Sequence, residues 1–320
     1  MSEPSASPSS PSSTRYALAA ALFAATCVTT LHAGAGIVLE RAPRGLSEVV
    51  RGWTFALPLM SILLSHELGH YIAARLHRVP VSPPYFLPIP AEWSLLGTMG
   101  AVIHMPDRIR TRRALFDIGA AGPLAGLVVA LPVLAYGLSI SEVRPIPPNG
   151  PAYLLEGRSL LYLALLRATH GTIPPGSDVF LSPPAMAGWA GLLVTMINLI
   201  PIGQLDGGHV AYALFGTRQD RASTLFLRLL PGLGIPVGAF FVIEALRAGK
   251  DLEAALPEAV CGMPWIVWTA LLLLLRRLSG PSHPRTDDDA LVGPRRALAV
   301  FTLALFPLLF MPFWMRAVEP

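Results

Sequence analysis

Long apolar runs constrain the fold of this chain more than any other feature. A membrane-crossing helix needs about 20 mainly apolar residues to traverse a hydrocarbon core of about 30 Å, and several segments approach that length. Only 14% of the 320 residues are charged, whereas soluble domains carry about 25%. The sequence therefore predicts an all-α polytopic membrane protein with about six to seven transmembrane helices. The candidate spans are 16–38, 53–76, 115–138, 184–202, 226–246, 259–275 and 297–315.

Two segments depart from the pattern of a simple span. Residues 79–106 are interrupted by Pro and Gly and contain residues that favour strands, which predicts a re-entrant, strand-like hairpin between the second and third spans. Such a loop is tolerated at membrane depth only where it lines protein or a wet cavity. Residues 157–171 are short and end in polar side chains, which favours a helix lying in the membrane interface.

The composition of the N-terminus predicts the domain organisation. Residues 1–14 are rich in Ser and Pro and too polar to pack, so we expect a disordered cytoplasmic tail. Residues 15–320 are then expected to form a single transmembrane domain with its core at residues 53–216.

The distribution of basic residues predicts the orientation and the compartment. With the N-terminus in the cytoplasm, 15 of the 24 arginines and lysines lie on the cytoplasmic side, as the positive-inside rule favours. These loops explain the formal net charge of +4, and because no basic block alternates with aromatic residues, nucleic acid is not an expected partner. The basic residues are almost all Arg, and Ala and Pro are abundant. This composition suggests a bacterial inner membrane.

The stretch "SHELGH" places three polar side chains, His66, Glu67 and His70, in an otherwise apolar span. Residues four apart project from one face of a helix, so both imidazoles could bind one Zn²⁺ and Glu67 could act as general base. The alternative is a pair of core histidines beside a glutamate that reaches the membrane surface. The complete His-Glu-x-x-His pattern favours the metal site, because ionisable residues inside a membrane mark function by default.

A catalytic zinc needs a third protein ligand, and Asp206 is the strongest candidate. It follows an apolar span that Pro and Gly residues interrupt, at a point where the chain returns to the side that receives His66 and His70. Its alternative role is that of a helix N-cap. The other acids and histidines fit structural roles better: they are Asp107, Asp117, His209 and Glu244.

Asn198 is a further polar residue in the same apolar run. Two roles remain open for its amide. It could bind substrate backbone or stabilise an oxyanion, or it could form a hydrogen bond with another helix.

Two separated motifs resemble one known family. "HELGH" followed by "NLIPIGQLDGGHV", with "LGTMGAVIHM" and "FDIGAAGPLAG" between them, is similar to the site-2 protease family of intramembrane zinc metalloproteases, peptidase family M50. The resemblance covers roughly residues 53–216 and is strongest to the chloroplast and cyanobacterial branch. It implies one zinc per chain.

The resemblance also implies roles for individual residues. His66, His70 and Asp206 would be the zinc ligands, Glu67 the base, and Asn198 a residue near the substrate. Residues 79–106 would form a hairpin beside the substrate path. Two features depart from the family: Gly203 stands where many bacterial members have Pro, and we expect neither the PDZ insertion common in other members, for which there is no room, nor a CBS-like domain after the core.

The predicted function is hydrolysis of peptide bonds in single-span membrane proteins, by water that zinc and a Glu base activate. The expected partners are a membrane-anchored protein substrate and the lipid bilayer. A catalytically idle membrane scaffold or a metal transporter is the alternative from another class, and a metalloprotease acting on soluble peptides is a second alternative. The transporter is disfavoured because its ionisable residues would be scattered through several spans.

Overall fold

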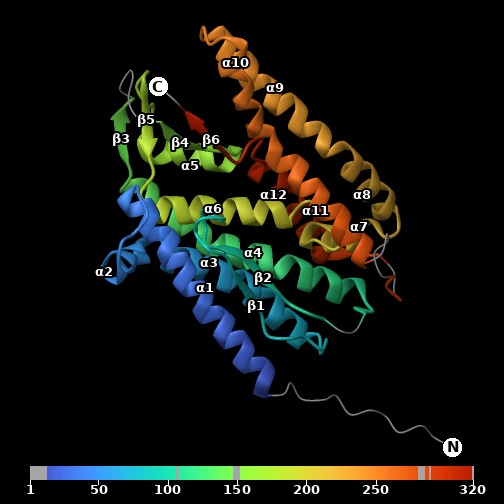
Figure 1. Ribbon diagram of the computed structural model, residues 1–320. Coiled ribbons are helices and arrows are strands. Elements are labelled where there is room, and N and C mark those ends of the chain that lie inside the picture. The colour runs from blue at the N-terminus through green and yellow to red at the C-terminus, as the bar shows by residue number, and fades with distance from the viewer. Residues whose placement is uncertain (1–12, 106–107, 147–151, 280–284, 288–289, 319–320) are drawn as a thin grey trace, which may run out of the picture.

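The long helices of the first half of the chain lie side by side (Figure 1). Most of the buried hydrophobic residues fall between residues 55 and 213. The computed structural model describes residues 13–105, 108–146, 152–279, 285–287 and 290–318. The predicted disordered tail falls mainly outside this part of the chain, since the first helix begins at Ser13.

Helices account for most of the described residues, as the apolar pattern predicts. In chain order they are α1 (Ser13–Leu39), α2 (Leu46–Val49), the 3-10 helix η1 (Val50–Gly52), α3 (Trp53–Leu76), α4 (Arg112–Ser139), α5 (Leu160–His170), α6 (Pro183–Asn198) and α7 (Asp206–Phe215). The C-terminal part continues with α8 (Arg218–Leu229), α9 (Pro231–Arg247), α10 (Leu252–Ala255), the 3-10 helix η2 (Leu256–Gly262), α11 (Met263–Ser279) and α12 (Gly293–Leu309).

Local sequence signals determine where several of these helices begin and end. The hydroxyls of Thr111, Ser159 and Ser182 accept hydrogen bonds from the first turns of α4, α5 and α6, as N-cap residues do. Helices α5 and α7 end at Gly171 and Gly216, which have positive φ angles of 66° and 62°. Glycine adopts that conformation without the strain a side chain would cause.

Three short antiparallel sheets connect distant parts of the chain. Strand β1 (Tyr85–Pro88) pairs with β2 (Thr98–Val102), β3 (Glu142–Pro145) with β5 (Ser177–Phe180), and β4 (Tyr153–Glu156) with β6 (Met315–Val318). In the last sheet Tyr153 lies opposite Val318. The C-terminal strand therefore returns to a segment that lies between α4 and α5.

Five described helical segments are long and apolar enough to cross a membrane: 13–39, 46–76, 112–139, 218–247 and 252–277. They coincide with five of the seven predicted spans, and the chain is a helical membrane protein. The remaining two predictions, 184–202 and 297–315, fall on α6 and α12, which have 16 and 17 residues. The polypeptide leaves the helix after Asn198 and again after Leu309, so neither reaches the expected length. The expected count of six to seven spans is not confirmed.

The two irregular segments contain the secondary structure expected of them. Residues 79–106 contain the β1–β2 hairpin, which lies against α1 with Phe23 and Phe86 in an edge-to-face contact at 5.2 Å between ring centroids. Residues 157–171 contain α5, which buries Tyr162 and Leu166. Their depth in the membrane stays a prediction.

The core that positions the site consists of α3, α4 and α6, whose backbones approach closely. A Cβ atom added at Gly69 would lie 2.4 Å from the carbonyl oxygen of Ala121, and one at Gly137 would lie 2.1 Å from the amide nitrogen of Ala185. Small residues permit such close approach between membrane helices, whose association depends on packing because lipid is as apolar as their side chains.

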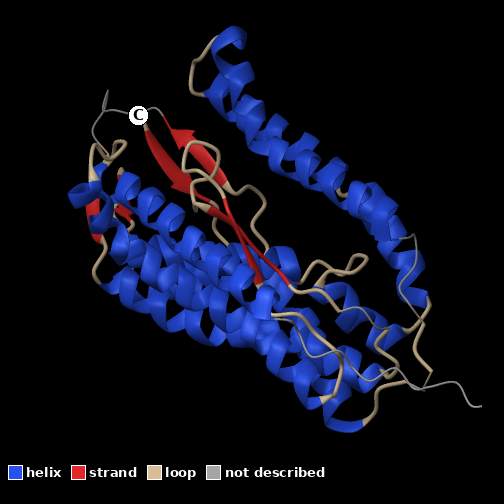
Figure 2. Ribbon diagram, turned by 60° about the horizontal axis from the view of Figure 1, so that its bottom comes forward, coloured by secondary structure: helices blue, strands red, loops and turns tan. Residues whose placement is uncertain are grey.

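Helices α8 to α11 form an outer hairpin beside this core (Figures 1 and 2). Helix α9 packs against η2 and α11. Trp265 of α11 stacks on Phe310 at 5.4 Å and its Nε1 donates a hydrogen bond to the carbonyl oxygen of Pro312 at 2.5 Å. The segment that follows α12 thus ties α11 of the outer hairpin to the core.

Candidate metal centre

His66 and His70 lie one turn apart on α3, and Asp206 is the first residue of α7. The Nε2 atoms of the two histidines are 3.2 Å apart. Oδ2 of Asp206 lies 3.3 Å from Nε2 of His66 and 3.2 Å from Nε2 of His70. The structure therefore brings the carboxylate of Asp206 to two histidines that lie about 140 residues before it in the sequence.

The spacing of these atoms fits a tetrahedral zinc site. Zinc–nitrogen and zinc–oxygen bonds of about 2.0–2.1 Å place neighbouring tetrahedral ligand atoms about 3.3 Å apart. All three pairs of ligand atoms match that value. Two imidazoles and one carboxylate are also a donor set that zinc uses in catalytic sites with one position left open.

A backbone contact orients one of the two histidines. Nδ1 of His70 donates a hydrogen bond to the carbonyl oxygen of Ile118 at 2.8 Å. That bond places the ring proton on Nδ1 and leaves the lone pair of Nε2 directed at Asp206 and His66. Metal-binding histidines are held in this way by a partner on the second ring nitrogen.

The broken segment after α6 delivers Asp206 to α3. The chain turns at Gly203, which has a φ angle of 56°. Cβ atoms added at Gly207 and Gly208 would lie 2.1 Å and 2.3 Å from the carbonyl oxygens of Leu199 and Gly203. The glycines thus allow the first turn of α7 to fold back on the preceding loop.

The N-cap role considered for Asp206 is wrong. The N-cap of α7 is Leu205, and its side chain forms no capping hydrogen bond. The carboxylate of Asp206 instead contacts the two histidines.

Glu67 and Asn198 lie beside the cluster. Nδ2 of Asn198 is 3.4 Å from Nε2 of His66, so the end of α6 contributes an amide to the site. Glu67 follows His66 directly on α3 and is half-buried.

Helix α4 contributes a glycine face that the sequence analysis missed. A Cβ atom at Gly122 would lie 2.0 Å from Nε2 of His70, one at Gly126 would lie 3.2 Å from Cβ of His66, and one at Gly119 would lie 2.8 Å from Cβ of His209. These glycines make room for the imidazoles. The available signal was their spacing in "FDIGAAGPLAG", which puts all three on one side of a helix.

The remaining candidates lie outside the cluster. Asp117 forms ion pairs with His77 at 2.8 Å and with Arg295 at 3.1 Å. Glu244 pairs with Arg316 at 2.7 Å. His209 packs against α4, as expected of a polar neighbour, and Asp107 is not among the described residues.

Fold and site together define a class. A bundle of apolar helices, a His-Glu-x-x-His helix, and a carboxylate from a second, broken helical segment have the layout of a membrane-integrated zinc metallopeptidase.

Comparison with known proteins agrees with this class. The sequence model of peptidase family M50 matches residues 54–230. The probable zinc metalloprotease EGY1, chloroplastic, of Arabidopsis thaliana is 31% identical over 95% of this chain and 54% of its own length. The probable zinc metalloprotease EGY2, chloroplastic, of Oryza sativa subsp. indica is 33% identical over 55% of this chain and 32% of its own length. No solved structure matches the chain.

The chain belongs to peptidase family M50, as its motifs predicted, and zinc is the metal that goes with this family. It spans about half the length, or less, of the curated relatives it matches. The names of those relatives place them in chloroplasts. These relatives therefore do not support the bacterial inner membrane that was expected from composition. The content of Arg, Ala and Pro reflects the base composition of a genome, and it does not distinguish a bacterial membrane from the membrane of an organelle.

Proposed function

We propose that this chain is an intramembrane zinc metalloprotease that hydrolyses peptide bonds of single-span membrane proteins. One observation carries the proposal: His66, His70 and Asp206 present ligand atoms at tetrahedral spacing, next to Glu67. Leu76, the last residue of α3, is six positions after His70, which is about 9 Å along the helix. The site is therefore proposed to lie below the membrane surface, within reach of water.

The residues around the metal have distinct chemical roles. Bound zinc would supply a Lewis acid that acidifies water and stabilises negative charge on oxygen. Glu67 takes the proton of the attacking water on its carboxylate and passes it to the leaving amine. The Nδ2 of Asn198 donates a hydrogen bond to the substrate carbonyl oxygen as charge develops there.

The substrate must present an unwound segment, because a helical peptide bond hides its carbonyl in a backbone hydrogen bond. The β1–β2 hairpin can pair with such a segment by strand addition. Its strand β2 exposes Met99 and Val102, at 63% and 52%, as a surface for an apolar substrate strand.

We further propose that residues 15–320 act as one transmembrane domain with a catalytic core at 53–216. The inner end of α3 and the N-terminus of α1 lie on the same side when the helices cross in alternation. That side carries the larger number of arginines, so the metal site is proposed to open toward it. In a bacterial membrane this is the cytoplasmic side.

The test is cleavage of a co-expressed, tagged single-span substrate by the wild-type chain and by Glu67→Gln. The amide cannot accept the proton, so cleavage should fall by about 10²–10⁴-fold, while zinc per purified chain stays near one. Undiminished cleavage by the variant would refute the mechanism. A wild-type chain that binds zinc and cleaves nothing would leave the scaffold or transporter instead, and cleavage of soluble peptides alone would leave the second alternative.

A further inference from the structure

Helix α8, the first helix of the outer hairpin, is hydrogen-bonded to the loop that precedes Asp206. On its inner face Gln219 Nε2 donates a hydrogen bond to the carbonyl oxygen of Pro201 at 3.3 Å, and the hydroxyl of Ser223 accepts one from the amide of Gly203 at 3.0 Å. Both side chains are buried. The position of α8 is thus coupled to the turn that precedes the metal ligand.

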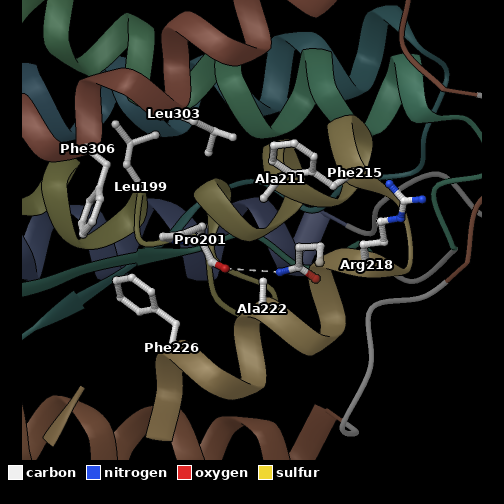
Figure 3. Close-up of a pocket in the computed structure, with 10 residues that line it drawn as sticks. Leu199, Pro201, Ala211, Phe215, Arg218, Ala222, Phe226, Leu303 and Phe306 are labelled. Carbon is white, nitrogen blue, oxygen red and sulfur yellow. Dashed lines mark hydrogen bonds between the residues drawn. The ribbon is translucent and has the colours of Figure 1, made fainter. Parts of the chain in front are cut away.

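The inner side of α8 also borders an apolar cavity of about 400 Å³ (Figure 3). Leu199, Phe215, Phe226 and Phe306 point into it, and the hydrogen bond from Gln219 to Pro201 lies at its wall. This cavity separates α8 from α12. Beside it, Phe226 of α8 and Phe306 of α12 meet edge to face with ring centroids 6.3 Å apart.

The outer face of α8 is different in character. A cleft of about 350 Å³ lies between α8 and the end of α11, lined by Asp220, Arg221, Thr224, Leu225, Arg228 and Arg276. Three arginines and one aspartate are among these lining residues. The side chain of Arg276 donates a hydrogen bond to Oγ1 of Thr224 at 3.0 Å, so the two helices already meet across the cleft.

This cleft lies at the end of the outer hairpin that we expect at the membrane surface. Segments 218–247 and 252–277 are both long and apolar enough to span, and Arg276 is in the last turn of α11. Leu225, Leu229 and Leu274 beside it are 59%, 60% and 52% exposed. A positively charged opening therefore adjoins an apolar flank that runs into the bilayer.

We propose that this cleft binds the phosphate of an anionic phospholipid, with the acyl chains lying along the exposed leucines. Arginine recognises phosphate through paired N–H donors, and basic pockets between membrane helices on the positive side suit anionic headgroups. The leucine flank favours a lipid over a soluble phosphate, because only a lipid covers apolar side chains and meets the guanidinium groups together. Occupancy would hold α8 against α11 and so restrain the loop at Pro201 and Gly203. The proposal is independent of whether the chain cleaves peptides.

The experiment uses the full chain purified in a mild detergent and exchanged with phosphatidylglycerol or phosphatidylcholine. Native mass spectrometry counts bound lipids, and a thermal melt measures stabilisation. Phosphatidylglycerol should bind and stabilise the wild type, and its affinity should fall about fivefold for each of Arg221→Gln and Arg276→Gln. Raising the salt concentration should have a similar effect, since charge drives the contact.

Arg277→Gln is the matched control, because it removes the same charge from the same turn of α11 but does not line the cleft. Equal losses for Arg276→Gln and Arg277→Gln would overturn the proposal in favour of nonspecific attraction to a basic surface. Stabilisation by inorganic phosphate equal to that by phosphatidylglycerol would overturn it in favour of a soluble anion. If Arg276→Gln fails to fold, the same comparison is made with Arg228→Gln.

Discussion

The inner helices and the outer hairpin are both apolar, yet they are built differently. In the most apolar 18-residue stretch of α4, 50% of the residues are buried, and in that of the α2–α3 segment 44% are buried. The corresponding windows of segments 218–247 and 252–277 are 28% buried. Both regions contain close glycine contacts, since a Cβ atom added at Gly262 in the outer hairpin would lie 2.0 Å from the carbonyl oxygen of Gly234, but the glycines of α4 lie against the site histidines. Exposed leucines and phenylalanines cover the outer hairpin.

The contrast shows what a polar site in a membrane requires. Ionisable side chains are costly in hydrocarbon and must be surrounded by protein. The glycines of α4 let α3 come close enough to bury His66 and His70 against backbone, whereas the close contact between Gly234 of α9 and Gly262 of η2 serves packing within the outer hairpin. We expect substitutions in the inner region to affect the metal and those in the outer region to affect local stability alone.

The largest effect is expected from the third ligand. Asp206→Ala removes one of three protein donors, so zinc affinity should fall by more than the roughly 10–100-fold that follows loss of an outer-sphere partner. Zinc per chain, measured by elemental analysis, should drop from near one toward zero. Asp117→Ala is the control, since this carboxylate pairs with His77 and Arg295. A zinc content that is equal in both variants would contradict the assignment.

A smaller effect is expected from a single methyl group. The Cβ of Gly122→Ala would lie 2.0 Å from Nε2 of His70 and must displace the imidazole, at about 1–3 kcal/mol of stability and with weaker zinc binding. Gly232→Ala in α9 meets nothing within 4 Å and should be neutral or stabilising by up to about 1 kcal/mol. Thermal melts with and without a chelator compare the two. If both variants keep wild-type zinc affinity, the glycine face is not what positions His70.

The smallest effect is expected where the C-terminal strand holds the outer hairpin. Arg316 is largely buried, pairs with Glu244 at 2.7 Å and Glu258 at 3.1 Å, and lies over the ring of Phe241. These carboxylates raise the pKa of its guanidinium. Arg316→Gln should cost about 1–2 kcal/mol and speed hydrogen exchange in α9 and η2.

The zinc content of Arg316→Gln should stay unchanged. Arg144→Gln, which breaks an exposed pair with Glu142, is the control and should stay within about 0.5 kcal/mol of wild type. Exchange that rises in α3 instead of α9 would show that the two regions are not separate.

Much of the candidate site could be predicted from the sequence, because its main part is local. His66, Glu67 and His70 share a helix whose period alone puts both imidazoles on one face. Asp206 could be selected because Pro201 and Gly203 break an apolar run beside it. The proximity of Asn198 to His66 also agrees with a role at the site. The glycine face of α4 was missed, because the spacing of glycines on a helix does not indicate which side chains of another helix pack against them.

The span count was less predictable. Length and hydropathy identified five of the seven predicted spans, but α6 and α12 end earlier than the apolar runs predicted there. Where a helix ends within an apolar stretch depends on what the following residues contact. Met311, for example, donates its backbone N–H to the sulfur of Met196 at 3.1 Å, which is a contact between segments 115 residues apart.

The sequence by itself determined that this chain enters a membrane and that α3 carries a pair of metal ligands, because both follow from composition and from the period of one helix. Only the tertiary structure decided that Asp206 meets them at 3.2–3.3 Å, that Gly122 and Gly126 make room for them, and that α8 joins the outer hairpin to the ligand-bearing loop. These are contacts between segments distant in sequence, and they depend on how the helices pack.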